Sequence, residues 1–256
     1  MKSSVKKRSN ASISVEALEL MRQADAVERP FIQITGLRKH YPTPSGDFIA
    51  LKGIDLAFEQ GKFSIIVGKS GAGKSTFVNM LTGVDHITAG EVWVDHIPVH
   101  RLDENQMALW RGLNVGVVYQ SFQLMPTLSL RDNIILAMDF CGLFHPVESG
   151  ERAMELLRMV ELQDHAYKLP SEISGGQQQR EAIARALAND PKLIIADEPT
   201  GNLDSVTAET VFQFFEKLVE QGKTLIMVTH DASLAQLAHR ILVIEDGQIT
   251  DEYARE

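Results

Sequence analysis

The chain has 256 residues, 44% of them apolar, which is enough to fill one large domain or a core with a subdomain. Its net charge is −9. Lys2, Lys6, Lys7 and Arg8 contribute four positive charges in a segment without acids, so the rest of the chain carries −13. Such an acidic body argues against nucleic acid as the main partner, because phosphate contacts need clustered Lys and Arg. A single cysteine, Cys141, excludes an internal disulfide and a Cys-based metal site.

No stretch of the sequence reaches the roughly 18 apolar residues that a membrane span requires. The longest candidate, residues 134–144, is too short and is interrupted by Asp139 and Gly142. The N-terminus is basic but lacks the apolar run of a signal peptide. We therefore expect a cytosolic chain that reaches a membrane only through a partner.

Residues 1–30 are predicted to be an appendage to a domain that spans residues 31–256. The basic run 2–8 predicts disorder. Apolar residues at helical spacing between Ser14 and Glu28 predict a short amphipathic helix. This helix could touch anionic lipid or a partner, or it could pack loosely on the body or fray. Pro30 ends the segment.

After Pro30, short apolar runs alternate with helical stretches, which predicts a largely parallel α/β sheet. Phe63 to Val67 is a continuous apolar run, typical of a buried strand, and a helix is predicted from Ser75 to Leu81. Other strands are predicted at residues 31–34, 54–58, 115–119, 193–196, 224–229 and 241–244.

Two further stretches complete the predicted domain. Asp246-Gly247 predicts a hairpin after the last of these strands. Residues of about 121–180 contain few strand-like runs, and a helix is expected there from Glu151 to Glu161. We therefore predict a helical subdomain over this range.

The segment from Gly68 to Ser75 fits the phosphate-loop pattern Gly-x-x-x-x-Gly-Lys-Ser/Thr in full. Its glycines allow successive amides to turn inward around phosphate oxygens, and the start of the following helix adds positive field. We expect Lys74 to neutralise the β and γ phosphates and Ser75 to bind Mg²⁺. A glycine-rich turn with a solvated lysine is the alternative. The residues predicted to contact nucleotide here are Gly68, Ser70, Gly71, Gly73, Lys74, Ser75 and Thr76.

Asp197 and Glu198 follow a buried apolar run, so both carboxylates are expected at the carboxyl end of a strand. Ligands bind at this edge of open α/β sheets. Asp197 is predicted to hold Mg²⁺, directly or through water, and Glu198 to accept a proton from the attacking water. On its own such a pair is as typical of a solvated turn.

A second helix start is predicted at Ser174-Gly175-Gly176-Gln177, where Ser174 suits the cap position. Amides at a helix N-terminus, small residues and the helix dipole make this a further anion site. In isolation, a flexible turn before a helix would explain the motif as well. Two anion sites roughly a hundred residues apart in one chain call for a common explanation.

These two motifs, followed by Leu193 to Glu198, resemble the ATP-binding subunit of ABC transporters. The resemblance covers about Phe31 to Gln248. It implies a P-loop NTPase core of the ABC ATPase type with an antiparallel β subdomain and a helical signature subdomain. It also implies ATP and Mg²⁺ as cofactors and hydrolysis of ATP to ADP and phosphate. In this family the signature of one subunit closes on the ATP held by a second ATPase subunit, in a head-to-tail dimer.

The family's other motifs are matched in order along the chain. Tyr41 matches the aromatic residue that stacks on adenine, and Gln120 matches the glutamine that touches Mg²⁺ and the attacking water. Asp204 ends the loop Gly201-Asn202-Leu203-Asp204, which matches the loop at the dimer interface, and His230 matches the histidine that bonds the γ-phosphate. Taken singly, Tyr41 or His230 would be more typical of a packed core residue. The resemblance thus implies Glu198, His230 and Gln120 as catalytic residues and Ser75, Gln120 and Asp197 as the metal site.

Gln120 to Asn133 and Gln177 to Arg180 resemble the branch of lipoprotein-releasing, macrolide-exporting and cell-division ATPases. That branch pairs with membrane permeases that have large extracytoplasmic domains. The resemblance implies a permease docked near Gln120 to Arg131, in a cleft between the core and the helical subdomain. It also implies a peripheral location on the cytoplasmic face of the plasma (inner) membrane. Ile173 stands where the family usually has leucine, which is a mild change.

Two other functions remain open. One is a soluble ABC ATPase acting on DNA or ribosomes; such proteins carry long coiled-coil insertions or two ATPase units, and this sequence has neither. The other is a division or envelope scaffold with little turnover, against which the intact Glu198 and His230 argue.

Overall fold

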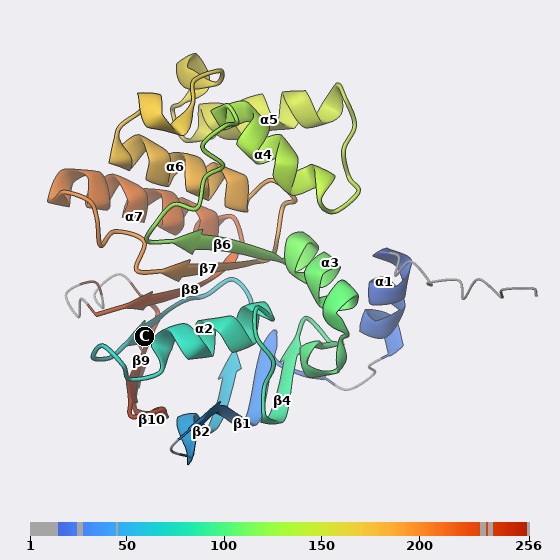
Figure 1. The fold of residues 1–256 in the computed structure, drawn as a ribbon, viewed down its shortest axis with the longest axis vertical. Coiled ribbons are helices and arrows are strands. Elements are labelled where there is room, and N and C mark those ends of the chain that lie inside the picture. Colours follow the sequence, from blue (N-terminus) through green and yellow to red (C-terminus); the bar gives the residue numbers. More distant parts are fainter. Residues whose placement is uncertain (1–14, 25–27, 45, 231–233, 235–237, 255–256) are drawn as a thin grey trace, which may run out of the picture.

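The computed structural model describes residues 15–24, 28–44, 46–230, 234 and 238–254. A small sheet lies at one end, a layer of helices at the other, and a larger sheet between them (Figure 1). The strands are β1 (Ile32–Thr43), β2 (Gly46–Phe58), β3 (Phe63–Val67), β4 (Ala89–Val94), β5 (Ile97–Pro98), β6 (Val115–Tyr119), β7 (Leu193–Asp197), β8 (Thr224–Thr229), β9 (Arg240–Glu245) and β10 (Gln248–Ala254). The α-helices are α1 (Val15–Ala24), α2 (Lys74–Thr82), α3 (Glu104–Asn114), α4 (Leu130–Asp139), α5 (Glu148–Met159), α6 (Gly175–Ala186) and α7 (Ser205–Glu220).

The larger sheet has the strand order β10-β9-β3-β8-β7-β6. Its strands β9, β3, β8, β7 and β6 run parallel, and β10 pairs antiparallel with β9. β7 and β8 are covered on both faces, which explains why they appear in the sequence as continuous apolar runs. Asp246 and Gly247 turn between β9 and β10 with φ of 46° and 74°, as a two-residue hairpin needs. The predicted parallel sheet and its closing hairpin are confirmed.

The smaller sheet is antiparallel, with the order β2-β1-β4-β5. One hydrophobic cluster fills the space between the two sheets around α2 and α3, and Trp110 of α3 is fully buried in it. A second cluster lies between the other face of the large sheet and helices α4 to α7. The large sheet therefore has a hydrophobic core on each face. The loops that follow its strands lie at the carboxyl edge of the sheet, outside both cores.

Several helices begin at a side chain that caps them. Ser129, Ser174 and Asp204 accept hydrogen bonds from amides in the first turns of α4, α6 and α7, and Asp103 forms a capping box with Gln106 at α3. The helix predicted from Glu151 to Glu161 is observed as α5, from Glu148 to Met159. Residues 121–172 contain no strand, and all of them are described.

The N-terminal helix predicted from Ser14 to Glu28 is observed over Val15–Ala24, and the basic run 2–8 lies outside the described residues. α1 lies beside α3 (Figure 1). Leu18 is buried in the cluster between the sheets. The Arg22 guanidinium lies 2.9 Å from the Asp95 carboxylate and donates to the Asn114 side chain at 3.0 Å. Of the alternatives for this segment, packing on the body is the one observed.

Deleting residues 1–29 is expected to leave ATP binding and turnover within a few-fold of the full chain, because no motif of the site lies there. The deletion should lower the melting temperature, since it exposes the apolar surface under Leu18. Thermal unfolding and steady-state ATP hydrolysis of the two chains check both parts. Loss of ATP binding in a folded, truncated chain would contradict the expectation.

Candidate active site

The glycine-rich loop joins β3 to α2 at the carboxyl edge of the large sheet. Gly73 has φ of 105°, and a Cβ there would lie 2.9 Å from the Ala50 carbonyl oxygen, so this position requires glycine. The Lys74 ammonium donates to the carbonyls of Gly68 at 2.7 Å and Lys69 at 3.1 Å. Lys74 is 8% exposed, so its charge is held against the loop and beside the cavity.

A cavity of about 400 Å³ collects most of the predicted residues. It is lined by Phe48, Ala50, Ser70, Gly71, Gly73, Lys74, Ser75, Thr76, Gln120, Glu198 and His230. These residues come from the ends of four strands of the large sheet and from the β1–β2 hairpin. The other predicted residues are not part of the lining: Tyr41, Gly68, Ser174 to Gln177, Asp197 and Asp204.

Glu198 follows β7 with φ of 50°, a conformation that non-glycine residues seldom adopt. Its amide donates to the Val228 carbonyl at 2.9 Å, and its carboxylate lies 2.8 Å from His230 Nδ1. The turn thus directs Glu198 toward His230 at the end of β8. Strained backbone of this kind is held in place by its surroundings and occurs often at functional sites.

Two of the three oxygen ligands predicted for Mg²⁺, Ser75 and Asp197, lie together beside Lys74. The Ser75 hydroxyl hydrogen-bonds to the Asp197 carboxylate. Burial raises the pKa of Asp197, and the adjacent Glu198 raises it further, whereas Ser75 and Lys74 lower it. A divalent cation bound here would favour the ionised form of Asp197, since a nearby positive charge lowers the pKa of a carboxyl.

Gln120 is the first residue after β6, and its side chain lies between the cavity and the loop Gly201-Asn202-Leu203-Asp204. It lines the cavity, and its amide nitrogen donates to Asn202 Oδ1 at 3.4 Å, while Asn202 donates back to the Gln120 carbonyl at 3.1 Å. The chain then turns through Phe122 and Gln123, both with positive φ, whose carbonyls accept hydrogen bonds from Arg185 of α6. The loop after Gln120 is therefore tied to α6.

Tyr41 lies beside the cavity rather than in its lining. Its hydroxyl donates to the Asp85 carboxylate at 3.0 Å and bonds to Thr76, and Lys39 lies over its ring. Phe48, its register partner on β2, lines the cavity and is largely exposed. Sequence reasoning missed Phe48, because only the pairing of β1 with β2 brings it to this position.

The motif at the start of α6 has the predicted cap, with Ser174 and Gln177 in a capping box. Gly176 has a packing role as well, because a Cβ there would lie 2.4 Å from the Thr207 methyl group of α7. Thr207 in turn donates to Asp204 at 2.7 Å, and Asp204 caps α7. The starts of α6 and α7 therefore pack directly against each other.

A model of the ABC transporter family matches residues 51–201, more than half of the chain. The chain belongs to the ABC transporter family. Among its relatives is the uncharacterized ABC transporter ATP-binding protein MJ0796 of Methanocaldococcus jannaschii, 42% identical over 225 residues that cover 86% of this chain and 96% of the relative. The prediction of an ABC ATPase subunit is confirmed.

Solved structures and longer relatives extend this assignment. The dimeric structure of MJ0796 bound to ADP and Pi superposes on the present chain with a TM-score of 0.82 at 40% sequence identity. The superposition covers 88% of the present chain and 99% of the MJ0796 chain, which confirms the fold class. The macrolide export ATP-binding/permease protein MacB of Syntrophobacter fumaroxidans is 44% identical over 223 residues, and the alignment spans 31% of its length. The predicted likeness to macrolide-exporting ATPases is confirmed.

The present chain contains a buried carboxylate, Glu181, that belongs to none of the predicted motifs. Glu181, in the middle of α6, is fully buried, and neither carboxylate oxygen has a hydrogen-bond partner among the described residues. Burial raises the pKa of Glu181 to about 8, against the lowering effect of Arg185 one turn further along. Glu181 is thus mostly protonated at neutral pH in the folded chain.

Replacing Glu181 by Gln is expected to make the ABC ATPase less sensitive to high pH. The unfolded chain ionises this group at an ordinary pKa, so the folded state loses stability as pH rises toward 8. Between pH 5.5 and 8.5 the wild type should lose on the order of 3 kcal/mol relative to the variant. Urea unfolding at both pH values measures this, with the exposed Glu209→Gln as the control. Equal responses of wild type and Glu181→Gln would show that Glu181 titrates normally.

Proposed function

We propose that this chain binds MgATP in the cavity beside Lys74, forms a head-to-tail dimer, hydrolyses the nucleotide and drives a separate membrane permease. The observation that carries the proposal is the gathering of Lys74, Gln120, Glu198 and His230 around one cavity while Ser174 lies outside it. The cavity contains the phosphate loop and a candidate base but not the signature residues Ser174 to Gln177. In the proposed dimer, a second chain supplies those residues and completes the site.

The residues of the cavity suit MgATP. The loop from Gly68 to Thr76 presents amides and the start of α2 to the phosphates, and Lys74 supplies a buried positive charge. Ser75, Asp197 and Gln120 offer oxygen ligands, which Mg²⁺ prefers together with phosphate oxygens. When bound, the metal would neutralise charge on the β and γ phosphates. Tyr41, with the exposed Phe48 beside it, would carry the adenine.

Glu198 is the proposed general base. Its carboxylate, oriented by the turn after β7, would take a proton from a water aligned on the γ-phosphate. His230 is placed by its bond to Glu198 to donate to the phosphate, and Gln120 to orient the water. Catalysis of this kind depends chiefly on positioning and charge stabilisation, for which three polar groups fixed at strand ends are suited.

In the proposed dimer, Ser174 to Gln177 of one chain close over the phosphates held by the other. The first amides of α6 lack partners within the helix, so a phosphate oxygen can accept from them. Asp204 lies at the start of α7 against α6 and would cross the same interface. ATP would favour the closed dimer because its phosphates bridge the halves, and hydrolysis would remove that preference.

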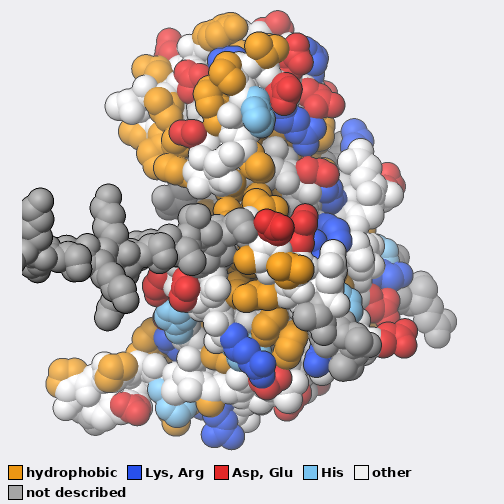
Figure 2. All heavy atoms as spheres, turned by 90° about the vertical axis from the view of Figure 1, so that its right-hand side faces the viewer, with side chains coloured by type: hydrophobic (Ala, Val, Ile, Leu, Met, Phe, Trp, Pro, Cys, Tyr) orange, Lys and Arg blue, Asp and Glu red, His pale blue; other side chains and the backbone are white. Residues whose placement is uncertain are grey.

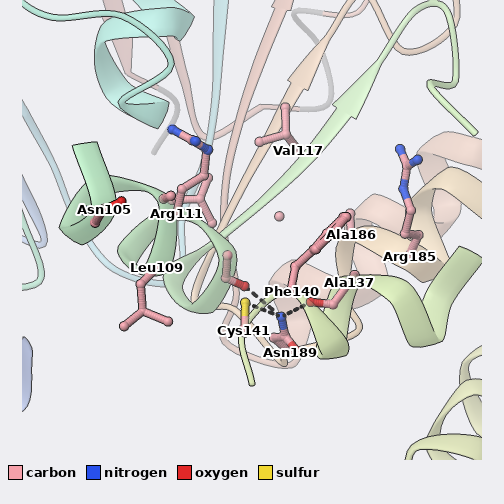
Figure 3. Close-up of a pocket in the computed structure, with 14 residues that line it drawn as sticks. Asn105, Leu109, Arg111, Val117, Ala137, Phe140, Cys141, Arg185, Ala186 and Asn189 are labelled. Carbon is pink, nitrogen blue, oxygen red and sulfur yellow. Dashed lines mark hydrogen bonds between the residues drawn. The ribbon is translucent and has the colours of Figure 1, made fainter. Parts of the chain in front are cut away.

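A groove of about 540 Å³ between the core and the helical layer is the proposed permease site. Its walls are α3 and the start of β6 on one side and the ends of α4 and α6 on the other (Figure 3). At its floor, Asn189 donates to the carbonyls of Gly112 at 2.8 Å and Ala137 at 3.0 Å, which joins the two walls. The lining lies outside Gln120 to Arg131, where docking was predicted. Arg185 connects the two regions, because it borders the groove and binds the carbonyls of Phe122 and Gln123.

None of the helices among the described residues is long and apolar enough to cross a membrane. We propose that the chain lies at the cytoplasmic face of the inner membrane, held there by its permease. The relatives named as ATP-binding/permease proteins support such a partner. The resemblance of Gln120 to Asn133 and of Gln177 to Arg180 to one branch of the family further implies that the permease carries an extracytoplasmic domain.

Purification of the tagged full chain from detergent extracts of its native cells tests the proposal. A polytopic membrane protein should co-purify, and Ala108→Glu, which places a charge on the exposed groove wall, should reduce its recovery at least tenfold. Tyr253→Glu on β10, exposed and outside the groove, is the control. Recovery of a ribosome or DNA complex instead would overturn the proposal.

A further inference from the structure

The connection between α4 and α5 exposes large apolar side chains. Phe140 is 76% exposed, Val147 69%, Phe144 43% and Leu143 38%. We refer to these four residues as the 140–147 patch. Isolated exposed hydrophobic residues are common, but four within eight consecutive positions form a concentrated apolar surface. Figure 2, which looks on to this side of the molecule, shows hydrophobic side chains gathered over the helical layer.

The backbone of this connection is held by specific hydrogen bonds. Gly142, with φ of 69°, ends α4: its amide donates to Asp139 and the amide of Leu143 donates to Met138, the arrangement of a Schellman motif. At the other end, the His145 amide donates to Ser149 Oγ at 2.9 Å. The apolar side chains are therefore presented outward by a turn in which the amides of Gly142, Leu143 and His145 are hydrogen-bonded.

The patch is continuous with the groove proposed for the permease. Phe140 belongs to both, and Figure 3 shows it between the α3 side chains and those of α6. The C-terminal end of α6 lines the groove, and Ser174 caps the N-terminal end of the same helix. The two ends of this 12-residue helix are about 18 Å apart. The patch therefore lies away from the face on which two copies would close over ATP.

We propose that the 140–147 patch is a second contact surface for the membrane permease, one that receives an apolar protein segment continuing from the groove. This inference rests on the proposed function, because it takes the groove to be the permease site. The patch adds apolar area next to a groove that also contains Arg111 and Arg185. A permease helix that is apolar along its whole length would be preferred over one that is apolar only where it lies in the groove.

Continuity with the groove argues for a protein segment rather than for the lipid surface. Phe140 belongs to both the groove and the patch, so a segment seated in the groove reaches the patch without leaving the protein surface. Charge does not distinguish the two occupants. From Asp132 to Glu151 the chain has four acids and no Lys or Arg, but Arg131, Arg152 and Arg158 line the same surface pocket as Val147. Segments that lie on anionic membranes normally combine apolar residues with basic ones, so binding to vesicles is tested directly.

Photo-cross-linking in cells that make the full chain tests the proposal. Benzoylphenylalanine is placed in turn at Ala108 in the groove wall, at Phe144 in the patch, and at Tyr253 as an exposed control. The same membrane protein should be captured from positions 108 and 144 and not from 253. Capture from 108 alone would refute the patch while leaving the permease groove in place, and capture from neither would refute both.

Other occupants give distinct results. Capture of a second copy of the chain from position 144, or flotation of the chain with vesicles of phosphatidylcholine and phosphatidylglycerol, would overturn the proposal. As a second measurement, the variant with Phe144→Ser and Val147→Ser should recover at least tenfold less of the captured membrane protein. The same variant should keep ATP turnover in isolation within twofold of wild type. Tyr253→Ser should change neither, and undiminished recovery by the double variant would also refute the patch.

Discussion

Replacing Glu198 by Gln is expected to retain ATP binding and to lower steady-state hydrolysis by at least a hundredfold. Glutamine fills the same space and can still bond to His230, which lies 2.8 Å from the Glu198 carboxylate, but it cannot accept the proton of the attacking water. The ATP-loaded dimer should therefore accumulate. Size-exclusion chromatography with MgATP and a phosphate-release assay measure the two effects, with the partner present if turnover requires it.

Glu209→Gln on the exposed side of α7 is a matched control, since it makes the same chemical change away from the cavity. It should leave both the turnover and the elution volume of the chain unchanged. Near wild-type turnover of Glu198→Gln would show that Glu198 is not the base. Loss of ATP binding by that variant would show that the carboxylate is needed to hold the nucleotide.

Mixing two inactive variants is expected to restore activity, because each site is proposed to contain Lys74 of one chain and Ser174 of the other. Lys74→Ala removes the phosphate charge and Ser174→Arg blocks the signature, so each homodimer has two defective sites. In a mixed dimer one site carries both lesions and the other carries none. Random pairing makes half of the dimers mixed, so equal amounts should restore up to roughly a quarter of the wild-type rate if the sites fire independently.

The mixing experiment requires subunit exchange and any permease that turnover depends on. If both sites must act together, hydrolysis would recover less, so trapping of one nucleotide per mixed dimer is the decisive measurement. Lys74→Ala mixed with a second Lys74 variant is the control, because no pairing of these chains creates an intact site. Verified mixed dimers that neither trap nor hydrolyse ATP would refute the two-chain site.

The parallel strands β6, at the edge of the large sheet, and β8, in its interior, could be predicted closely because most of their residues are buried. Residues 115–119 and 224–229 were bounded as they are observed in β6 and β8, since an apolar run there ends where the chain leaves the core. The smaller sheet was harder to predict. β4 contains glycine and glutamate and is only partly buried, so neither alternation nor a continuous run marks it, and α3 was likewise not predicted.

The residues of the site also divide into those that a local sequence pattern places and those that only the tertiary structure places. Lys74, Glu198 and His230 could be placed together because their motifs follow strands that end at one edge. Phe48 could not, because its position depends on the register of a hairpin with several irregularities. The exposed Phe144 looks like a core residue in the sequence, and the buried Glu181 looks like a surface residue of a helix. In each case burial is decided by packing between elements distant in sequence.

The contact between Gly176 and Thr207 has a mechanical consequence. Because the Thr207 side chain packs directly on the backbone of Gly176 and is hydrogen-bonded to Asp204, a displacement of Ser174 is expected to move Asp204 with it. Asn202, in the same loop, is bonded to Gln120, whose neighbours are bonded to Arg185 at the far end of α6. These contacts form a closed ring, so in the proposed dimer a permease that pushes beside Arg185 and a nucleotide that binds at Ser174 would act on the same connected set of elements.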